Sequence, residues 1–449
     1  MLHDTIAAIA TPPGRGGVGI VRISGPAVAA IAEAVIGGLP PPRQAALRRF
    51  RDVAGAVIDH GIALYFPKPH SFTGEEVLEL QGHGGVVVLD LLLQRVVACG
   101  ARIAHPGEFS QRAFLNGRID LTQAEAVADL IAAGSAAAAR LAVRSLEGAF
   151  SERIHSLVET LIGLRMEVEA AIDFPEEELE LLAEERLVAG LQRLLQQLAA
   201  TLASARSGRL LRDGILLVIA GAPNVGKSSL LNALAGYASA IVSATPGTTR
   251  DLLRERIQID GIPVHLVDTA GLRLSEDPIE QEGMRRARSE LARADLLLWL
   301  VEDGDDAQPA WSTLPPELPA TLPHIVVRNK IDLSGAPPSV EQQPGGDVVV
   351  RISAREGSGM DLLRGQIRQL AVGEGSGEGE FLARRRHLDA LTRGECHLRQ
   401  GLEQLQQRRA GELLAEELRL AQAALGEITG EFSADDLLGE IFAGFCIGK

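Results

Sequence analysis

The residues whose types and spacing point most directly to chemistry form the segment Gly221-Ala-Pro-Asn-Val-Gly-Lys-Ser228. It fits the phosphate-loop pattern G-x-x-x-x-G-K-[ST], in which glycines let successive backbone N–H groups face phosphate oxygens at a helix N-terminus. In such a loop Lys227 reaches the β- and γ-phosphates, and Ser228 holds Mg²⁺. An apolar run at 215–220 precedes the loop and a helical pattern follows it. These flanks favour a nucleotide loop over a plain glycine turn.

A second segment, Asn329-Lys330-Ile331-Asp332, indicates which base is bound. The Asp332 carboxylate can accept hydrogen bonds from N1–H and from the exocyclic amine of guanine. Adenine has neither donor there, so an ATP site would leave this carboxylate unpaired at a cost of about 1–3 kcal/mol. The sequence therefore favours GTP over ATP. Ser353 and Ala354 match the loop that backs the base.

A third segment, Asp268-Thr-Ala-Gly271, follows another apolar run and is typical of the Mg²⁺ and γ-phosphate end of a GTPase site. Between it and the phosphate loop, residues 247–251 form a predicted switch in which Thr249 is the second Mg²⁺ ligand. The residues predicted to bind GTP are Gly221, Asn224, Val225, Gly226, Lys227, Ser228, Ser229, Ser243, Ala244, Thr245, Pro246, Gly247, Thr248, Thr249, Asp268, Thr269, Ala270, Gly271, Asn329, Lys330, Asp332, Ser353 and Ala354.

Hydrolysis requires a group that orients the attacking water. Small signalling GTPases place a glutamine directly after D-x-x-G, but this chain has Leu272, which cannot orient water. Four acidic residues downstream are candidates, and the chemistry alone does not choose among them: Glu276, Asp277, Glu280 and Glu282.

Negative charge between the β- and γ-phosphates must also be neutralised. Asn224 and the oxygens of residues 243–248 could hold a monovalent cation there. Arg250 or Arg273 is the rival source of positive charge. Both alternatives stay open on this reasoning.

The elements that position these groups divide the chain into four predicted segments. Strand patterns at 5–10, 18–23, 53–64 and 77–80, with helices at 27–36 and 84–98, predict an α+β domain over 1–117. Long helical patterns, among them 136–171, dominate 118–211 and return over 372–449. Residues 212–371 predict a doubly wound α/β GTPase domain, mostly parallel with one antiparallel strand, inserted into the helical domain. A hairpin is expected where 252–259 and 263–267 meet.

Composition limits the partners and the compartment. The chain has 449 residues and a formal net charge of −15, so any RNA contact is expected to be a local patch on an acidic body. Its three cysteines, Cys99, Cys396 and Cys446, make neither a disulfide framework nor a zinc cluster. With no predicted signal peptide or spanning helix, a cytoplasmic protein without a membrane partner is expected. His83 and His105 are expected to be structural.

The chain resembles the MnmE (TrmE) family of tRNA modification GTPases over nearly its whole length. The GTPase motifs alone would fit several families, whereas the remaining blocks are specific. Those blocks are Asp4-Thr-Ile-Ala, Thr11 to Gly25, Ser71 to Gly85, Pro106 to Gly117, Asp120 to Ala126, Ala171 to Pro175 and the terminal Phe445-Cys-Ile-Gly-Lys449.

The resemblance implies a multidomain α+β fold with an N-terminal folate-binding and dimerisation domain, a helical domain and an inserted Ras-like P-loop GTPase domain. The tetrahydrofolate derivative, 5,10-methylene- or 5-formyl-tetrahydrofolate, would contact Arg22, Glu79, Arg118 and Lys449. Arg118 stands where some relatives have lysine. K⁺ would be held by Asn224, Ser243, Thr245 and Thr248, and Glu280 would orient the water.

The same resemblance implies a homodimeric, K⁺-dependent GTP hydrolase that acts with the flavoprotein MnmG, in a heterotetramer or larger complex, on wobble uridine 34 of certain tRNAs. Its catalytic residues would be Glu280, Lys227 and Cys446, although a lone cysteine is more often only a small apolar residue. Two other classes of GTPase fit the sequence less well. A ribosome-assembly GTPase explains the nucleotide motifs but not the folate-like blocks, and a plain signalling switch does not explain Leu272 and Asn224.

Overall fold

The computed structural model describes residues 4–173, 180–237, 254–259, 262–268, 294–304, 322–343, 347–372, 380–408, 411–431, 435–445 and 448. The chain forms two compact units. The first comprises Met1–Ile131, Ser145–Ile162 and Arg419–Lys449, and the second comprises Ala132–Arg144 and Gly163–Leu418. Each unit contains one mixed sheet.

The sheet of the first unit has six strands in the order β3-β4-β5-β2-β1-β6. Their bounds are β1 Ile6–Ile9, β2 Gly16–Ser24, β3 Ala46–Arg51, β4 Val57–Phe66, β5 Val77–Gly84 and β6 Arg102–Ile103. All neighbouring strands pair antiparallel except for the pair β1 and β6, which is parallel. Strand β2 thus lies in the middle of the sheet, between β5 and β1.

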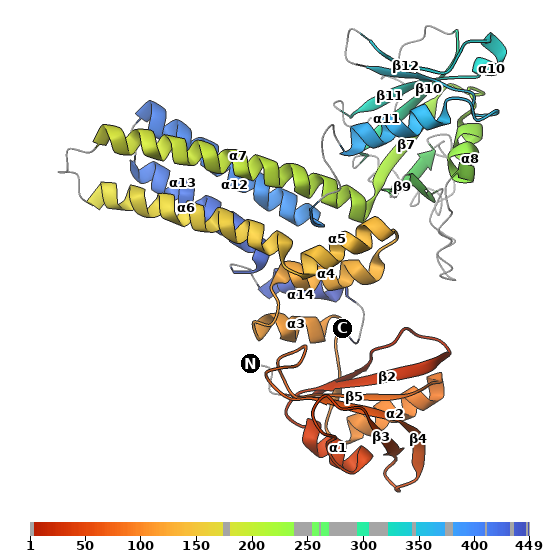
Figure 1. Ribbon diagram of the computed structural model, residues 1–449, viewed down its shortest axis with the longest axis vertical. Helices are drawn as coiled ribbons and strands as arrows, with labels where there is room; N and C mark the ends of the chain where they lie inside the picture. The colour runs from red at the N-terminus through yellow and green to blue at the C-terminus, as the bar shows by residue number, and fades with distance from the viewer. Residues whose placement is uncertain are drawn as a thin grey trace, which may run out of the picture. The chain divides into compact units, whose positions relative to one another are not determined.

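The two faces of this sheet are covered differently. Helices α1 (Val28–Ile36) and α2 (Val86–Ala98) pack on one face, over a core that includes Val21, Leu78 and Leu80 (Figure 1). On β2 and β5 these buried positions alternate with partly exposed ones, which is the period of a strand with one covered face. A separate apolar cluster joins Phe109 of α3 (Glu108–Leu115) to β1.

The sequence predicted most of these elements, but not the hairpin β3–β4. A single strand was expected over 53–64, whereas residues 52–56 form the connection and β4 begins at Val57. Strand β3 was missed because its sequence, Ala-Leu-Arg-Arg-Phe-Arg, buries only Phe50 fully and lacks an apolar alternation.

Four further helices contribute to the first unit in part or in whole. Helix α4 (Leu121–Ala132) packs through Leu121 and Ala124 against Phe442 of α14 (Asp435–Ala443) and against Phe445. The N-terminal part of α6 (Ala149–Asp173) and the C-terminal part of α13 (Gly411–Thr429) complete the set. Thr122 Oγ1 and Ser151 Oγ hydrogen-bond at 2.7 Å, which joins α4 to α6.

The helix predicted over 136–171 is interrupted in the structure. Helix α5 (Ala136–Leu146) ends before Gly148, which adopts φ 100° and separates it from α6. A left-handed backbone at this position stops an α-helix and suits glycine. Helix α13 ends in the same way, at Thr429 before Gly430, which has φ 92°.

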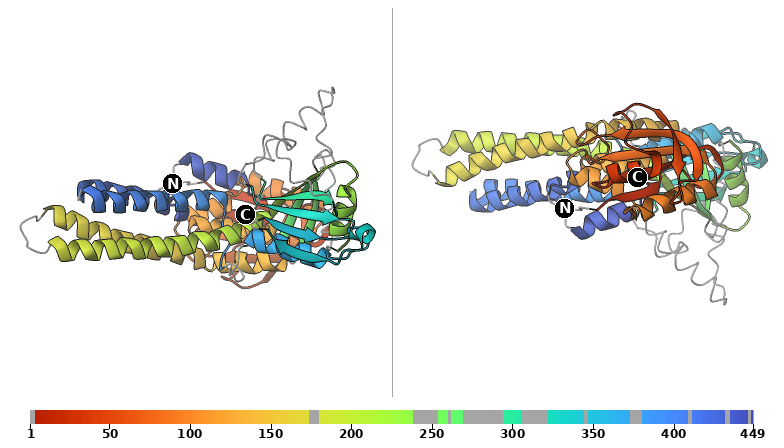
Figure 2. Two further views of the ribbon diagram at one scale, coloured as in Figure 1. Left: turned by 90° about the horizontal axis from the view of Figure 1, so that it is seen from above. Right: turned by 90° about the horizontal axis from the view of Figure 1, so that it is seen from below.

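In the second unit, helices from both sides of the nucleotide motifs pack together. Helix α7 (Glu180–Asp213) precedes the strands of the sheet and α12 (Arg385–Arg408) follows them, yet the two lie side by side in every view (Figure 2). The intervening segment is therefore an insertion between two packed helices.

The sheet of the second unit has seven strands in the order β12-β13-β11-β10-β7-β9-β8. Their bounds are β7 Ile215–Gly221, β8 Arg254–Ile259, β9 Ile262–Asp268, β10 Leu296–Glu302, β11 His324–Asn329, β12 Ser339–Gln342 and β13 Val348–Arg351. The five inner strands are parallel and both edge strands, β8 and β12, are antiparallel to their neighbours. The prediction of a single antiparallel strand was therefore wrong, because the structure has two. Strand β12 was missed because it is mostly exposed and polar and lacks the apolar pattern of a buried strand.

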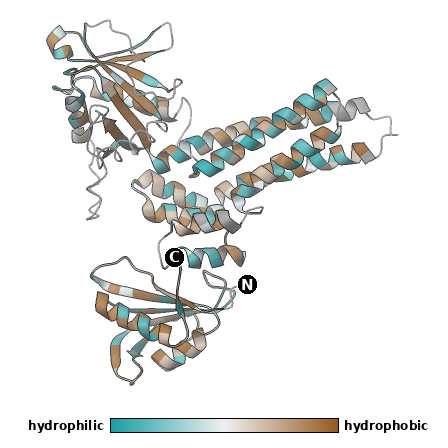
Figure 3. Cartoon of the chain, turned by 180° about the vertical axis from the view of Figure 1, so that it is seen from behind, coloured by the Kyte–Doolittle hydropathy of each residue, from teal (hydrophilic) through white to brown (hydrophobic). Residues whose placement is uncertain are grey.

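The inner strands are continuous apolar runs, as expected for a sheet buried on both faces (Figure 3). Helices α8 (Lys227–Tyr237), α10 (Ile331–Ser334) and α11 (Met360–Val372) complete this part of the unit. The expected hairpin is confirmed, since Ile259 of β8 pairs with Ile262 of β9. Within the described residues, no helix is both long and apolar enough to cross a membrane.

Candidate functional site

The predicted nucleotide groups converge at one edge of the seven-stranded sheet. Strand β7 ends at Gly221, β9 ends at Asp268, and β11 ends at Asn329. Parallel pairing aligns these ends, because Ile219 lies opposite Asp268 and Leu300 lies opposite Gly221. In open α/β sheets this carboxyl edge is where ligands bind.

The phosphate loop joins β7 directly to α8, whose first residue is Lys227. Asn224 has φ 64° and Gly226 φ 101°, so the chain curls through left-handed conformations before the helix starts. The Lys227 ammonium donates to the main-chain oxygens of Gly221 at 3.0 Å and Ala222 at 2.8 Å. It therefore lies across the mouth of the loop, while Ser228 is exposed at the helix N-terminus.

Asn329 connects the phosphate loop to the base-reading segments. It is 2% exposed, and its Nδ2 donates to the Val225 oxygen at 2.9 Å. Its Oδ1 accepts from the Ala354 N–H at 3.0 Å. A β-carbon on Gly226 would lie only 2.3 Å from Asn329 Nδ2, so a side chain there cannot coexist with this contact.

Asp332 is held by the other predicted base-binding residue. Its Oδ1 accepts from Ser353 Oγ at 2.7 Å, and that hydroxyl also accepts from the Glu356 N–H at 3.2 Å. Lys330 adopts φ 70° and donates to Glu302 Oε2 at 2.8 Å. Asn329, Asp332, Ser353 and Ala354 thus form one connected group, and its members come from β11, α10 and the segment after β13.

Several residues that the sequence singled out for binding or catalysis lie outside the described part of the chain. They are Ser243, Ala244, Thr245, Pro246, Gly247, Thr248, Thr249, Arg250, Thr269, Ala270, Gly271, Leu272, Arg273, Glu276, Asp277, Glu280, Glu282, Cys446 and Lys449. For Asp268 the backbone is placed but the side chain is not described. Their predicted roles therefore stay predictions.

Comparison with known proteins gives the family. A family model described as "MnmE helical domain" matches residues 121–446, and one described as "GTP-binding protein TrmE N-terminus" matches residues 5–118. The chain is also 57% identical to the tRNA modification GTPase MnmE of Sodalis glossinidius (strain morsitans), over 99% of both chains. The chain belongs to the MnmE (TrmE) family of tRNA modification GTPases.

A second relative, the tRNA modification GTPase MnmE of Yersinia pestis bv. Antiqua (strain Angola), is 58% identical over 99% of both chains. Among solved structures, the Era protein of Aquifex aeolicus bound to GDP and AlF4⁻ is 26% identical and covers 40% of this chain and 66% of its own, with a TM-score of 0.25. The predictions of a GTPase of this family and of its multidomain α+β fold are confirmed.

The first unit brings together two of the four residues for which the family resemblance implied folate contact. Arg22 on β2 lies opposite Glu79 on β5, and Arg22 Nε donates to Glu79 Oε1 at 2.9 Å. Arg22 Nη1 donates to the Gly448 oxygen at 3.2 Å, so the C-terminal tail reaches the same place. The guanidinium also lies 5.8 Å from the centroid of the Phe109 ring, within cation–π range.

The other two predicted folate residues are placed less fully. The Arg118 side chain is exposed, and its stem lies beside Gly74 in the loop before β5. Lys449 is not described, but its neighbour Gly448 packs so closely on β1 that a β-carbon would lie 2.5 Å from the Ile9 oxygen.

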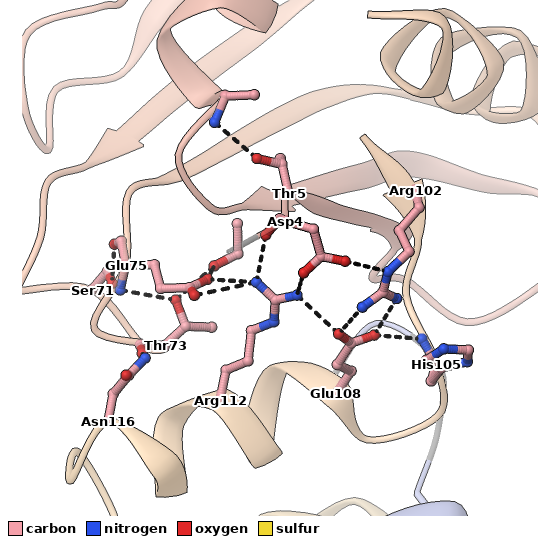
Figure 4. A network of polar contacts seen from close by, with 12 residues as sticks. Asp4, Thr5, Ser71, Thr73, Glu75, Arg102, His105, Glu108, Arg112 and Asn116 are labelled. Atoms are coloured by element: carbon pink, nitrogen blue, oxygen red, sulfur yellow. Dashed lines mark hydrogen bonds and ion pairs between the residues drawn. The ribbon is translucent and has the colours of Figure 1, made fainter. Parts of the chain in front are cut away.

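A buried ion-pair network lies beside this group (Figure 4). Arg112 of α3 is 1% exposed and donates to Asp4 Oδ1 at 2.7 Å, Glu108 Oε1 at 2.9 Å and Glu75 Oε2 at 3.1 Å. Arg102 adds contacts to Glu108 at 2.5 Å and to Asp4 at 2.5 Å. The network therefore fixes α3, and with it Phe109, to β6 and the N-terminal segment.

Hydrogen bonds extend this network to the sheet. Ser24 Oγ, two residues after Arg22 on β2, bonds to Thr73 Oγ1 and donates to Glu75 Oε2, both at 2.7 Å. Asn116 Nδ2 donates to the Thr73 oxygen at 2.7 Å, which holds the same loop to the end of α3. The loop before β5 is thus tied on both sides.

The network shifts the pKa values of its carboxyl groups. Burial raises the pKa of Glu108, but hydrogen bonds from Arg102, the His105 N–H and Arg112 outweigh it, and the pKa lies below its ordinary value. The same balance, between burial and the two arginines, lowers the pKa of Asp4. Both groups are therefore ionised at neutral pH.

Sequence reasoning missed this network. Asp4, Glu75, Glu108 and Arg112 each lie in a block that carried the family resemblance, which was the available signal. Their partnership was not visible, because Arg112 and Asp4 are 108 residues apart in the chain.

Proposed function

We propose that this chain is a K⁺-dependent GTP hydrolase that, with the flavoprotein MnmG, adds a carboxymethylaminomethyl or aminomethyl group to C5 of wobble uridine 34 in certain tRNAs. The observation that carries the proposal is membership of the MnmE family over 99% of the chain. The nucleotide edge of the sheet supports the hydrolase part, and the Arg22–Glu79 group supports the folate part.

The nucleotide edge suits guanosine triphosphate. Asp332 presents a carboxylate already oriented by Ser353, which matches the paired donors of guanine. Lys227 now donates to loop carbonyls, and the same ammonium can turn to the β- and γ-phosphates. Mg²⁺ would be held by Ser228, at the start of α8, and by Thr249.

Two catalytic roles are proposed for residues outside the described part of the chain. Glu280 would orient the attacking water, since Leu272 has no polar group to do so. K⁺ would neutralise charge between the phosphates, held by Asn224, Ser243, Thr245 and Thr248. Asn224 is exposed in the phosphate loop, where its amide oxygen is available to a cation.

The folate derivative would bind at the Arg22–Glu79 group, with Arg118 and Lys449 as further contacts. The group suits such a ligand because a partly exposed guanidinium and carboxylate meet at the C-terminal tail. Bound there, the folate supplies the one-carbon unit. Cys446 lies two residues before Gly448, so we place its role in tRNA modification at the same site.

The domain division is proposed with boundaries at 117/118, 211/212 and 371/372. The N-terminal domain would bind folate and form the homodimer, and GTP hydrolysis would open and close the GTPase domains. The proposed complex contains the homodimer, MnmG and tRNA, and the proposed compartment is the cytoplasm.

Mass spectrometry of wobble nucleosides tests this function. A deletion strain is complemented with the wild-type gene or with Cys446→Ser. Loss of the modified uridine on deletion, with recovery by wild type alone, supports both the reaction and the tail. Unchanged nucleosides in the deletion strain would overturn the proposal and turn attention to a ribosomal precursor defect.

A further inference from the structure

The outermost strand of the first sheet is lined with arginines. Strand β3 ends the order β3-β4-β5-β2-β1-β6, so its outer side faces away from the sheet (Figure 1). It contains Arg48, Arg49 and Arg51, and Arg43 precedes it. Arg43, Arg49 and Arg51 are exposed, and Arg48 is partly exposed. We call these four residues the arginine edge.

Within the part of the chain that the structure describes, none of the four guanidinium groups forms an ion pair with a carboxylate. Three of them donate to main-chain oxygens, which are Arg43 to His70 at 2.7 Å, Arg48 to Leu47 at 3.1 Å and Arg51 to Gly55 at 3.1 Å. By contrast, the arginines of the buried network and of the folate group contact carboxylates. The positive charge of the arginine edge is therefore available to an external anion.

The two acidic residues near this edge are engaged by other groups. Asp52 Oδ1 accepts from the Ala56 N–H at 2.8 Å, in the connection between β3 and β4. Asp59 contacts the ring and the N–H of His83, both at 2.8 Å. Residues 43–70 contain five arginines and lysines against these two acids, a formal charge of +3 in a chain of −15. This segment is thus a local basic patch on an acidic protein, as an RNA contact requires.

Protection of the sheet edge alone does not account for the arginines. Charged side chains on an edge strand keep other sheets from pairing with it, but either sign of charge serves that purpose. All four charges here are positive, although like charges close together on a sheet repel one another. Arg49 lies opposite His60, which supplies no negative charge. Arginine binds phosphate through its planar guanidinium, so the pattern favours a row of phosphates.

Part of the arginine edge shares a face of the sheet with the folate group. Leu47 of β3 lies opposite Ile62 of β4, and Ile62 lies opposite Gln81 of β5, two residues from Glu79. Side chains alternate along a strand, so Arg49, two residues after Leu47, is on the same face as Glu79. Leu47 and Ile62 are exposed, so this part of the face is open in the first unit.

The separation between the two groups suits a folded RNA. Arg49 and Arg22 are three strands apart across the sheet and four residues apart along it. At about 4.8 Å per strand and about 3.3 Å per residue, they are separated by about 20 Å. Phosphates of one anticodon arm lie within such a distance of its wobble base. An RNA whose base reaches Arg22 therefore brings its backbone to the arginine edge.

We propose that the arginine edge is the surface on which this protein binds the phosphate backbone of its tRNA substrate. The inference rests on the proposed function, because it places the modified base at the folate group. Phosphate contacts set the register and orientation of a nucleic acid and carry no sequence information directly. The arginine edge thus orients the anticodon arm and does not select the tRNA by sequence.

Salt-dependent tRNA binding by the full-length protein tests this surface. The variant Arg48→Gln/Arg49→Gln/Arg51→Gln removes three charges and keeps polar side chains. We expect it to bind unmodified tRNA at least 10-fold more weakly in about 0.1 M KCl. The slope of log affinity against log salt should fall by about 2–3, since each phosphate contact contributes about 0.7–0.9. The variant Arg48→Lys/Arg49→Lys/Arg51→Lys keeps the charges and should retain the wild-type slope.

A matched control removes the same amount of charge elsewhere. Arg140→Gln/Arg144→Gln/Arg206→Gln changes three exposed arginines of α5 and α7. It should leave tRNA affinity and its salt slope within two-fold of wild type. GTP hydrolysis and folate binding should stay within two-fold of wild type in every variant, because none of these arginines contacts either site.

A photo-crosslink gives a readout that does not depend on affinity. Leu47, which is 75% exposed beside Arg48, is replaced by p-benzoylphenylalanine in the full-length protein. Irradiation with tRNA should attach the protein to nucleotides of the anticodon arm. Attachment to the acceptor arm alone, or to no part of the tRNA, would contradict this placement.

Each outcome bears on one proposal or both. Unchanged tRNA affinity of the edge glutamine variant, or an equal loss in the control, would overturn the surface. Normal tRNA binding with loss of the homodimer or of the MnmG complex, measured by sedimentation, would assign the edge to a protein partner instead. Wild-type protein that neither binds nor modifies tRNA would remove the proposed function and this inference together. Active wild type with an unaffected edge variant would remove this inference alone.

Discussion

Asn329 at the end of β11 donates a hydrogen bond to the Val225 oxygen in the phosphate loop, 104 residues earlier in the chain. Its Oδ1 meanwhile accepts from Ala354. One buried side chain thus connects the phosphate loop to the two base-reading segments.

Gly226→Ala should therefore weaken GTP binding by at least 10-fold. The new β-carbon would lie 2.3 Å from Asn329 Nδ2, and the residue must keep φ 101°, which L-residues rarely adopt. The control is Gly236→Ala in α8, where a β-carbon meets nothing within 4 Å and the change should stabilise the helix by about 0.5–1 kcal/mol. Fluorescence titration with GTP measures the nucleotide affinity of both variants and of the wild type. Equal affinity of the two variants would contradict the geometry.

Asp332→Asn should change base preference. The amide can accept one hydrogen bond but no longer two, and the loss of a charged acceptor costs about 1.5–3 kcal/mol, or about 10- to 100-fold in GTP affinity. Xanthosine triphosphate carries a carbonyl where guanine has its amine, so it should bind the variant better than wild type. Competition binding with both nucleotides measures this. A variant that keeps its preference for GTP would remove Asp332 from base recognition.

The nucleotide edge was predictable from sequence because each motif there is contiguous and follows its own strand. Asn329 and Asp332 are three residues apart, and one turn of backbone sets their relation. The Arg112 network was not predictable, because the packing of α3 against the N-terminal segment and β6 brings its members together. Strand β12 was missed for a related reason, since an exposed edge strand has no apolar alternation. Hydrophobic patterns in the sequence indicate which residues are buried. They do not show strand pairing or contacts between segments that are far apart in the chain.

Replacing KCl with NaCl should lower GTP turnover and weaken the pairing of GTPase domains. A cation site built from neutral oxygens, Asn224 among them, selects by size, whereas an arginine does not distinguish the two salts. Steady-state hydrolysis and analytical ultracentrifugation in matched ionic strength provide the readouts. Equal rates in both salts would favour Arg250 or Arg273 as the source of positive charge.

Glu280→Ala should abolish most GTP hydrolysis while leaving GTP affinity within two-fold, because the carboxylate is assigned to the water and not to the nucleotide. Single-turnover hydrolysis with saturating protein separates the two effects. Glu282→Ala is the control, since it removes a neighbouring acid without that role. Retained turnover in Glu280→Ala would mean that another acidic residue of the segment, Glu276, Asp277 or Glu282, orients the water.

Glu79→Gln should weaken folate binding by about 10- to 100-fold, as expected for the loss of a hydrogen bond to a charged group worth about 1.5–3 kcal/mol. The variant keeps an oxygen acceptor for Arg22 Nε, so the sheet should remain intact. Glu33→Gln on α1, which covers the opposite face, is the control and should bind folate normally. Equilibrium binding of 5-formyl-tetrahydrofolate measures the difference. Unchanged affinity would place the folate elsewhere.

Glu108→Gln should destabilise the first unit by about 1.5–3 kcal/mol at neutral pH, because it removes one of the three carboxylates that contact the buried Arg112 guanidinium. The pH dependence follows from the lowered pKa of Glu108. A carboxyl whose pKa is depressed by folding contributes stability that is fully present above its ordinary pKa of 4.5 and is lost as pH falls through the lower folded pKa. The difference in Tm between wild type and variant should therefore be constant from pH 8 to about pH 5 and shrink below about pH 4.5. Scanning calorimetry of the full-length chain measures it, with the exposed Glu147→Gln as control. A Tm difference that stays constant down to pH 3 would mean that ionisation of Glu108 does not stabilise the fold, and that the variant acts only through packing.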